Sequence, residues 1–229
     1  MSLRIAIIVA DEPWDEFYEK YGTYASFFVD WMRPVLPDAE FEVINVVGGM
    51  ALPRDPGMYD GYLISGSRYG VYDDQPWLEP LRDFLRRARD HGSPMGGICF
   101  GHQIMAEAFG SDVGKSPDGY VMGVETYGDK GAYALHQDQV FTVPEGAATV
   151  MSSPRCDIGR IEYAFPALSV QHHPEFTTAH FNDLMALYRD ILSKEAFETA
   201  LKHPDAQRDS LDIAKDFAQI LQSQTLGGP

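Results

Sequence analysis

The sequence predicts an α/β fold, in which an open and mostly parallel sheet carries helices on both of its faces. The chain begins with a continuous apolar run at Leu3–Ala10 (LRIAIIVA), a pattern typical of a strand that is buried on both faces. Segments with strand patterns then alternate with segments of helical spacing as far as Phe109. Such alternation indicates βαβ units, whose parallel strands lie beneath crossover helices.

The elements of this first half are predicted from apolar spacing and from residues that end helices. The helix that starts at Tyr24 is expected to stop near Pro34 and Pro37, because proline cannot continue a helix. The segment Trp77–His91 places its large apolar side chains on one side, as an amphipathic helix does. Strands are predicted at Leu3–Ala10, Phe41–Val47, Tyr59–Ser65 and Pro94–Cys99, and helices at Tyr24–Leu36, Trp77–His91 and Gly101–Phe109.

The second half of the chain has a different pattern. Short strand-like runs separated by turns over Met122–Val150 predict an antiparallel ribbon or an extension of the sheet. Two more strands are expected at Ile158–Ala164 and Ala167–Gln171, and the patterns that follow them are helical. We therefore expect one domain over residues 1–229, with a flavodoxin-like core at 3–177 and a helical tail at 178–229.

Composition limits the expected partners and compartment. The net charge is −16, from 18 basic and 34 acidic residues, which repels phosphate backbones and anionic lipid surfaces. We therefore expect no nucleic-acid and no membrane partner. Two cysteines do not make a disulfide framework, and no apolar run approaches the roughly 18 residues of a membrane span. The N-terminal run is too short for a secretory signal, so a cytoplasmic location is expected.

A cysteine between two glycines is the most informative feature of the sequence. Cys99 lies in "GGICFGHQ", where a predicted strand meets a predicted helix. This is the arrangement of a nucleophile elbow, in which the flanking Gly97 and Gly101 allow a sharp turn. The helix N-terminus favours thiolate over thiol, and the N–H of Phe100 can bind an oxyanion. The alternative is that Cys99 is a small buried apolar residue, as free cysteines usually are.

A thiolate nucleophile needs a base, and the stretch "SVQHHPEF" supplies a candidate. His173 and Glu175 are two residues apart beyond a predicted strand, and on extended chain residues at that spacing point the same way. Pro174 restricts both its own backbone and that of His173. His172 would face the opposite side and is expected to pack in the interior. Because 74 residues separate Cys99 from His173, only the fold can bring them together.

Together, "GGICFGHQ" and "QHHPE" resemble the signatures of the class I, triad-type glutamine amidotransferases, a G-x-C-x-G-x-Q elbow and a later H-P-E. The resemblance covers residues 3–176. The stretches "SGSRYGVYDDQPWL" and "HQDQV" are similar to stand-alone members related to the amidotransferase part of GMP synthetase. The resemblance implies that Cys99 is the nucleophile, His173 the general base and later acid, and Glu175 the carboxylate that orients the imidazole.

The resemblance also implies a binding role for residues outside the triad. Gln103 matches the glutamine of the elbow motif, which lines the substrate pocket. Gly66 and Ser67 fall in the oxyanion loop, where the family commonly has S-G-G, so the oxyanion hole would be formed by the N–H groups of Ser67 and Phe100. The family also places a loop near the glutamine where this chain has His136 and Asp138. The alternative for that loop is a simple turn before a strand.

The resemblance implies amide hydrolysis of a γ-glutamyl group through a cysteine thioester. One option is a glutaminase that hands ammonia to a separate synthetase subunit, because the chain has no P-loop motif and no evident acceptor domain. A γ-glutamyl peptidase is the second option, and a non-catalytic binding or regulatory module, including a redox sensor, is the third. No cofactor or metal is expected, and Cys156 lacks an elbow and is expected to be structural.

Overall fold

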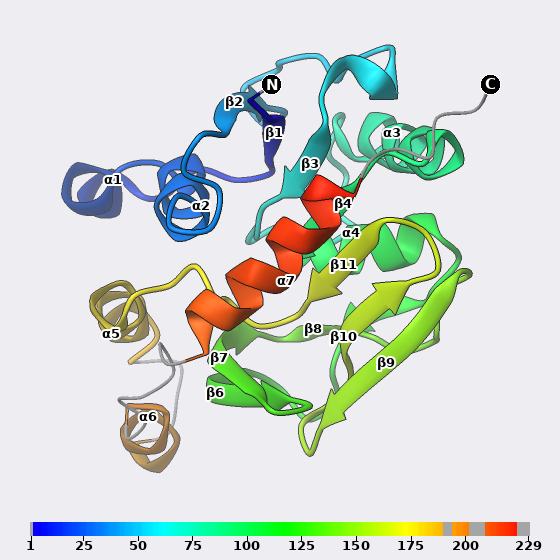
Figure 1. The fold of residues 1–229 in the computed structure, drawn as a ribbon. Coiled ribbons are helices and arrows are strands. Elements are labelled where there is room, and N and C mark those ends of the chain that lie inside the picture. Colours follow the sequence, from blue (N-terminus) through cyan, green and yellow to red (C-terminus); the bar gives the residue numbers. More distant parts are fainter. Residues whose placement is uncertain (1, 190–193, 202–208, 224–229) are drawn as a thin grey trace.

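The computed structural model describes residues 2–189, 194–201 and 209–223, and its centre is a seven-stranded sheet (Figure 1). The strands lie in the order β2-β1-β3-β4-β11-β10-β9. Neighbours from β2 to β11 are parallel, whereas β10 and β9 are added antiparallel. The predicted open, mostly parallel sheet with an antiparallel extension is therefore confirmed. The strands are β1 (Arg4–Val9), β2 (Glu40–Asn45), β3 (Gly61–Ile64), β4 (Met95–Ile98), β9 (Ala147–Ser153), β10 (Cys156–Tyr163) and β11 (Ala167–Val170).

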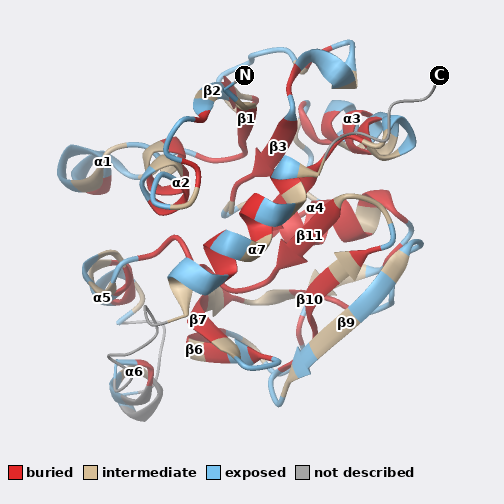
Figure 2. Ribbon diagram, viewed as in Figure 1, coloured by how far each residue is buried: buried red, intermediate tan, exposed pale blue. Residues whose placement is uncertain are grey.

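Helices cover both faces of this sheet, as the alternation predicts. The side chains of β1 alternate, so that Ile5 and Ile7 pack with α2 and α7 while Ala6 and Ile8 pack with α3 and α4. Figure 2 shows the result, with buried residues on the central strands and on the inner faces of these helices. The helices are α1 (Asp15–Tyr21), α2 (Tyr24–Met32), α3 (Leu78–His91), α4 (Phe100–Ala108), α5 (Thr178–Leu187), α6 (Lys194–Ala200) and α7 (Ser210–Gln222), with a 3₁₀ turn at Pro56–Met58.

The last helix, α7, lies across the front of the sheet (Figure 1). Phe217 is fully buried, and its ring lies 5.2 Å from that of Trp31 on α2. The indole Nε1 of Trp31 donates a hydrogen bond of 3.1 Å to the carbonyl of Ser210. A segment near the C-terminus thus supplies part of the apolar cover over the N-terminal strands.

The predicted ribbon of the second half forms two small sheets beside the main one. β6 (Val121–Tyr127) pairs antiparallel with β7 (Lys130–His136), and β5 (Val113–Lys115) pairs antiparallel with β8 (Asp138–Val140). The carbonyl of Tyr133 on β7 accepts a hydrogen bond of 2.6 Å from the backbone N–H of His173. This bond connects the β6–β7 ribbon to the segment that follows β11.

Element boundaries differ from the predicted ones where local signals are weak. The helix α1 has no apolar spacing that would distinguish it from a loop, and the sequence did not predict it. The helix expected to reach Leu36 ends at Met32, two residues before Pro34. Of the predicted helical tail at 178–229, residues 190–193, 202–208 and 224–229 lie outside the described residues. Within the described ranges, no helix is long and apolar enough to cross a membrane.

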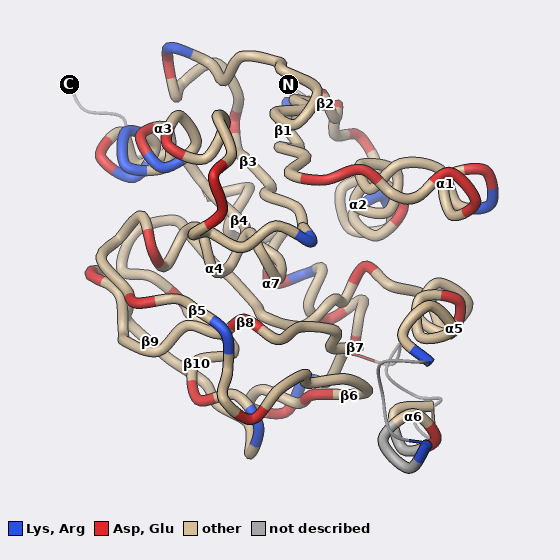
Figure 3. The backbone as a smooth tube through the Cα atoms, turned by 180° about the vertical axis from the view of Figure 1, so that it is seen from behind, with Lys and Arg blue, Asp and Glu red and all other residues tan. Residues whose placement is uncertain are grey.

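Charged side chains of α3 join this helix to α4. In the view from behind, both arginines and acidic residues lie along α3 (Figure 3). Arg82 Nε lies 2.6 Å from Glu107 Oε2 on α4 and its Nη1 lies 3.2 Å from Glu79 Oε2. The Arg82 side chain is mostly shielded from solvent. Its pairing with Glu107 therefore helps to fix the position of α4 against α3.

A buried histidine of α4 joins this helix to β10 and β11. His102 is fully buried, with Nε2 2.9 Å from the carbonyl of Ile158 and Nδ1 2.8 Å from the hydroxyl of Ser169. A carbonyl only accepts, so Nε2 carries the proton and Nδ1 accepts from the hydroxyl. Burial lowers the pKa of His102 to about 4, so the imidazole is neutral at pH 7.

We expect His102→Gln to weaken the dependence of stability on acid. An unfolded histidine takes up a proton as the pH falls below about 6.5, whereas His102 in the folded protein does so only near pH 4. Between these two pH values the unfolded state binds the proton and the folded state does not. Acid therefore lowers the unfolding free energy across this interval. Between pH 7.5 and pH 5 the wild type should lose about 2 kcal/mol more unfolding free energy than the variant. Urea unfolding at the two pH values measures this.

The matched control is His91→Gln, which makes the same change at an exposed position of α3. It should keep the acid dependence of the wild type. An unchanged acid dependence in His102→Gln would contradict the assignment of His102 as a buried neutral imidazole.

Candidate active site

The backbone turns sharply between β4 and α4, and Cys99 lies at this turn. Its φ is 52° and its ψ is −105°, a strained combination for a residue with a side chain. Cys99 has the one positive φ among the non-glycine residues that the structure describes. A Cβ at Gly97 would lie 2.5 Å from the carbonyl oxygen of Gly101, and a Cβ at Gly101 would lie 2.3 Å from the carbonyl oxygen of Ile64. The two glycines are therefore required for this close approach.

His173 and Glu175 form a buried ion pair just beyond β11. The imidazole Nδ1 lies 2.6 Å from Glu175 Oε1, and both side chains are less than a tenth exposed. Burial lowers the pKa of His173, but the negative charges of the Glu175 carboxylate and the Cys99 sulfur outweigh it and raise this pKa to about 10. The ring of Phe176 stacks on the imidazole, with centroids 4.1 Å apart. The imidazole is thus held as a cation in a fixed orientation.

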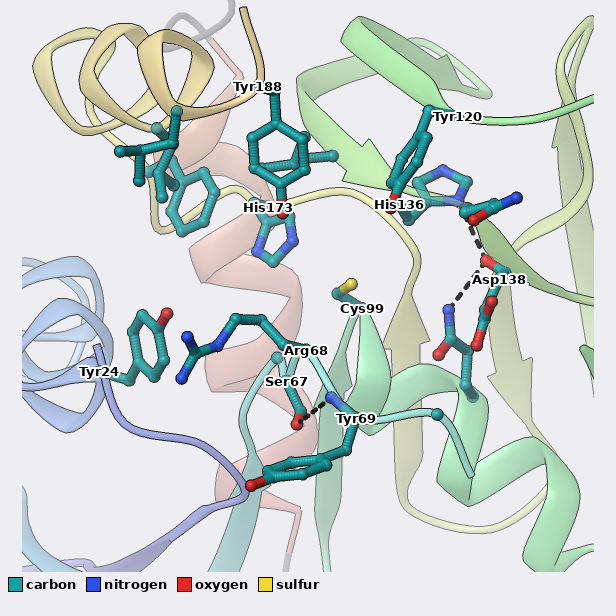
Figure 4. Close-up of a pocket in the computed structure, with 18 of the residues that line it drawn as sticks. Tyr24, Ser67, Arg68, Tyr69, Cys99, Tyr120, His136, Asp138, His173 and Tyr188 are labelled. Carbon is teal, nitrogen blue, oxygen red and sulfur yellow. Dashed lines mark hydrogen bonds between the residues drawn. The ribbon is translucent and has the colours of Figure 1, made fainter. Parts of the chain in front are cut away.

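The fold brings Cys99 and His173 to the same cavity. A Cβ placed on Gly66 would lie 3.0 Å from His173 Cε1 and 3.7 Å from Cys99 Cβ, so all three residues meet at one point. In Figure 4 the sulfur of Cys99 points into the cavity beneath the His173 ring. The cavity measures about 490 Å³ and is also lined by Glu175. It opens at the carboxyl ends of the central strands, where open α/β sheets carry their ligands.

The loop after β3 lies against the elbow. The Ser67 hydroxyl donates to the carbonyl of Ala10 at 2.8 Å and accepts from the Tyr69 N–H at 3.0 Å, which fixes the loop. The Ser65 carbonyl accepts from the N–H of Gly101 at 3.1 Å. In the described part of the chain, neither the N–H of Ser67 nor that of Phe100 donates to a protein acceptor. Both N–H groups are therefore available to a ligand.

We call the side of the cavity beyond α4 the polar lobe; it is lined by Gln103, Lys115, His136, Gln137 and Asp138. Gln103 Nε2 donates to the carbonyl of Asp138 at 2.9 Å, and the Tyr72 hydroxyl donates to the Asp138 carboxylate at 2.8 Å. Burial raises the pKa of Asp138 and lowers that of His136 to about 3. His136 Nδ1 donates to the Asp138 carbonyl at 3.1 Å, so the lone pair at Nε2 is an acceptor.

We call the opposite side the aromatic lobe; it is lined by Trp14, Tyr24, Phe27, Phe176, Leu184 and Tyr188. In Figure 4, Tyr24 and Arg68 lie on one side of Cys99 and His136 and Asp138 on the other. Sequence reasoning missed this lobe. Its residues come from the segment before α1, from α2, from the segment after β11 and from α5 and its end. No local pattern distinguishes them from ordinary core residues, because aromatic residues at helical spacing are typical of any buried helix face.

The predicted site residues therefore fall in one region. Cys99, His173, Glu175, Gly66, Ser67, Gln103, His136 and Asp138 all line the cavity, and Phe100 follows Cys99 at the start of α4. Cys156 lies away from the cavity: it is buried, and burial raises the pKa of its thiol to about 11. His172 is buried beside Tyr127, with ring centroids 4.8 Å apart. Within the described residues, no cluster of three or more His, Cys, Asp or Glu could hold a metal ion.

Comparison with known proteins identifies the class of protein that this fold and site define. The model of the family described as glutamine amidotransferase class-I matches residues 51–187. A candidate glutamine amidotransferase of Saccharomyces cerevisiae is 32% identical over 219 residues, covering 85% of this chain and 87% of the relative. The chain belongs to the class-I glutamine amidotransferase family.

Two further comparisons extend this result. Gamma-glutamyl peptidase 5 of Arabidopsis thaliana is 28% identical over 193 residues, covering 76% of each chain. The crystal structure of a glutamine amidotransferase from Thermotoga maritima superposes with a TM-score of 0.72 at 20% identity, covering 96% of both chains. The structural likeness extends the fold assignment to nearly the whole length of the chain.

We expect the two cysteines to differ strongly in reactivity. Cys99 lines the cavity beside the His173 cation, whereas Cys156 is closed off and its thiol has a raised pKa. At pH 7.5, iodoacetamide should modify Cys99 at least about 100-fold faster than Cys156. Peptide mass spectrometry over a time course measures both rates.

Cys156→Ala should keep the fast reaction, and Cys99→Ala should lose it. Similar rates for the two thiols in the wild type would show that the imidazole does not activate Cys99.

Proposed function

We propose that this protein hydrolyses the side-chain amide of a γ-glutamyl group, with Cys99, His173 and Glu175 as its catalytic triad. The observation that carries the proposal is the meeting of a strained elbow cysteine with a buried imidazole–carboxylate pair in one cavity. Nucleophile, base and orienting group are the three parts that covalent amide hydrolysis needs.

In the first half of the reaction the Cys99 thiolate attacks the amide carbon and forms a C–S bond. The developing oxyanion is bound by the N–H groups of Ser67 and Phe100, which have no acceptor within the described chain. The imidazolium of His173 gives its proton to the leaving nitrogen as the C–N bond breaks. The products of this half are a γ-glutamyl thioester and an amine, or ammonia when the donor is glutamine.

In the second half a water molecule enters the place that the amine has left. Neutral His173 takes one proton from this water, and the resulting hydroxide adds to the thioester carbon. The C–S bond then breaks, glutamate leaves and the Cys99 thiolate is restored beside the His173 cation. The Glu175 carboxylate stays hydrogen-bonded to Nδ1 of His173 in both halves of the reaction. The other nitrogen, Nε2, therefore always faces the reacting atoms.

We place the α-amino end of the γ-glutamyl group in the polar lobe. The buried Nε2 of His136 has no hydrogen-bond partner among the described residues, and its lone pair can accept a hydrogen bond from an ammonium group. The Asp138 carboxylate adds a negative charge at the same place, while Lys115 on the neighbouring strand is suited to the α-carboxylate. Gln103 holds the lobe in shape through the carbonyl of Asp138.

Two acyl donors fit this chemistry, and they differ only in the group that leaves. Ammonia would leave from L-glutamine and would be of use to a separate synthetase subunit, a partner that the similarity to the GMP synthetase group suggests. A larger amine would leave from a γ-glutamyl peptide or conjugate, and the relative named gamma-glutamyl peptidase 5 supports this second donor. We propose a cytoplasmic location for either reaction, since both cysteines are free and the reactive thiol requires a reducing compartment.

We expect Cys99→Ala to abolish the release of glutamate from L-glutamine and from γ-glutamyl peptides. Loss of the nucleophile should lower kcat by about 10,000-fold or more, because the remaining groups cannot form the thioester. Enzymatic measurement of free glutamate with purified protein gives the rate.

N-acetyl-L-glutamine is the matched substrate control, because it keeps the amide and lacks the ammonium that the polar lobe is proposed to bind. It should be a poor substrate of the wild type, measured by ammonia release, because its acyl product is N-acetylglutamate and not glutamate. Glutamate release that persists in folded Cys99→Ala would overturn the mechanism.

We expect Glu175→Gln to be less harmful than Cys99→Ala and to change the pH profile. It should lower kcat by roughly 100- to 10,000-fold, as loss of an orienting carboxylate does. Glu175 raises the pKa of His173, so without its charge this pKa falls and the imidazolium is lost at lower pH. The alkaline limb of kcat/KM should therefore move to lower pH.

A pH–rate profile of the residual activity tests the second effect. An alkaline limb that stays in place would show that Glu175 does not act through His173, whatever the loss of rate.

A further inference from the structure

We propose that the aromatic lobe binds the leaving group, and that the natural substrate is a γ-glutamyl amide whose amine carries an aromatic or bulky apolar group. This inference rests on the proposed function and goes beyond it, because it names the chemistry of the amine. It also assigns the specificity for that amine to Tyr24 and Tyr188, which no motif marks.

The position of the lobe follows from a chain of ring contacts that starts at the triad. The ring of Phe176 stacks on His173, with centroids 4.1 Å apart. From Phe176 the contacts continue to Phe27 at 6.5 Å and from there to Tyr24 at 5.8 Å. Aromatic surface therefore begins at the group that must protonate the leaving nitrogen and extends away from it.

Tyr24 of the aromatic lobe lies on the opposite side of Cys99 from His136 and Asp138 of the polar lobe (Figure 4). When the thiolate attacks an amide carbon, the acyl chain and the leaving nitrogen extend from that carbon in different directions. His136 and Asp138 offer acceptors for the charged end of the acyl chain. The leaving nitrogen then lies on the His173 side, where Tyr188 is above the imidazole and Tyr24 lies farther out.

The cavity is larger than the smallest donor requires. Its volume of about 490 Å³ lies within the range of roughly 300–1,000 Å³ that is typical of sites for drug-sized ligands. L-glutamine is much smaller than such ligands and, with its charged end in the polar lobe, would leave the aromatic lobe empty. The indole of Trp14 at the edge of this lobe is 39% exposed. An apolar leaving group would cover surface that otherwise faces water.

The charge of the aromatic lobe is balanced. Arg68 is bound by Asp11 through two side-chain hydrogen bonds, of 2.7 Å from Nε and 2.8 Å from Nη2. The guanidinium also lies 4.3 Å from the ring of Trp14. Burial raises the pKa of the Tyr24 hydroxyl, which therefore stays neutral at physiological pH. Neutral apolar groups are compatible with this lobe, and among the described residues that line it no excess charge selects an ionic leaving group.

Two substrates that differ only by a phenyl ring test the proposal. γ-L-Glutamyl-ethylamide and γ-L-glutamyl-phenethylamide release alkylamines, so the reacting amide is alike in the two. We expect kcat/KM of the wild type to be at least about tenfold higher for the phenethylamide, the size of effect that an apolar subsite gives. Equal values would overturn the proposal.

Variants of the lobe test which residues make this preference. Tyr24→Ala and Tyr188→Ala should each lower the phenethylamide-to-ethylamide ratio of kcat/KM by about fivefold or more, and Tyr24→Phe should retain it. Tyr24 is the first residue of α2, where alanine is well tolerated. Tyr18→Ala is the matched control, since Tyr18 is 54% exposed and does not line the cavity. Ratios unchanged by both alanine variants would overturn the assignment of these residues.

Binding to Cys99→Ala separates failure of this inference from failure of the proposed function. This variant cannot form the thioester, so calorimetry reports the affinity for the intact amides. A wild type that hydrolyses neither amide would contradict the proposed function, while tighter binding of the phenethylamide than of the ethylamide would still support the aromatic subsite. Hydrolysis of both amides without a difference in rate or affinity would contradict only the present inference.

Discussion

The close approach of three backbone segments at the elbow is the constraint on which the site depends. β4 must turn into α4 beneath β3, and side chains at Gly97 and Gly101 would collide with backbone there. The turn strains the backbone of Cys99, which adopts a positive φ that the surrounding structure must enforce. The turn directs the sulfur into the cavity at the end of the sheet and leaves the N–H of Phe100 without an acceptor among the described residues. The close packing of β3, β4 and α4 therefore also sets the position of the Cys99 side chain.

The buried ion pair of His173 and Glu175 needs support from outside its own strand. Two opposite charges in a low-dielectric interior attract strongly, but their desolvation is costly unless the geometry is good. The β6–β7 ribbon contributes to that geometry, because the Tyr133 carbonyl holds the backbone N–H of His173. Phe176 fixes the plane of the imidazole by stacking. The small β6–β7 sheet beside the central one therefore supports the site.

The groups proposed to react and the residues of the aromatic lobe come from different parts of the fold. In the proposed mechanism the nucleophile, the base and the oxyanion donors come from the central strands and the turns at their ends. The aromatic lobe comes from α2, from α5 and from the segments beside them, none of which belongs to the turn between β4 and α4. Changes in these peripheral segments can alter which amine is accepted and leave the reacting groups in place.

The sequence by itself determined those features that follow from local geometry. Alternating apolar patterns predicted the parallel sheet, paired glycines predicted the elbow, and the two-residue spacing of His173 and Glu175 predicted that they face the same way. Only the tertiary structure decided that α7 covers the sheet and that Trp14, Tyr24 and Tyr188 share one lobe. The reason is physical: backbone periodicity is encoded within a few residues, whereas an aromatic side chain looks the same in sequence whether it fills a core or lines a cavity. More than 160 residues separate Tyr24 from Tyr188, and their meeting depends on every element packed between them.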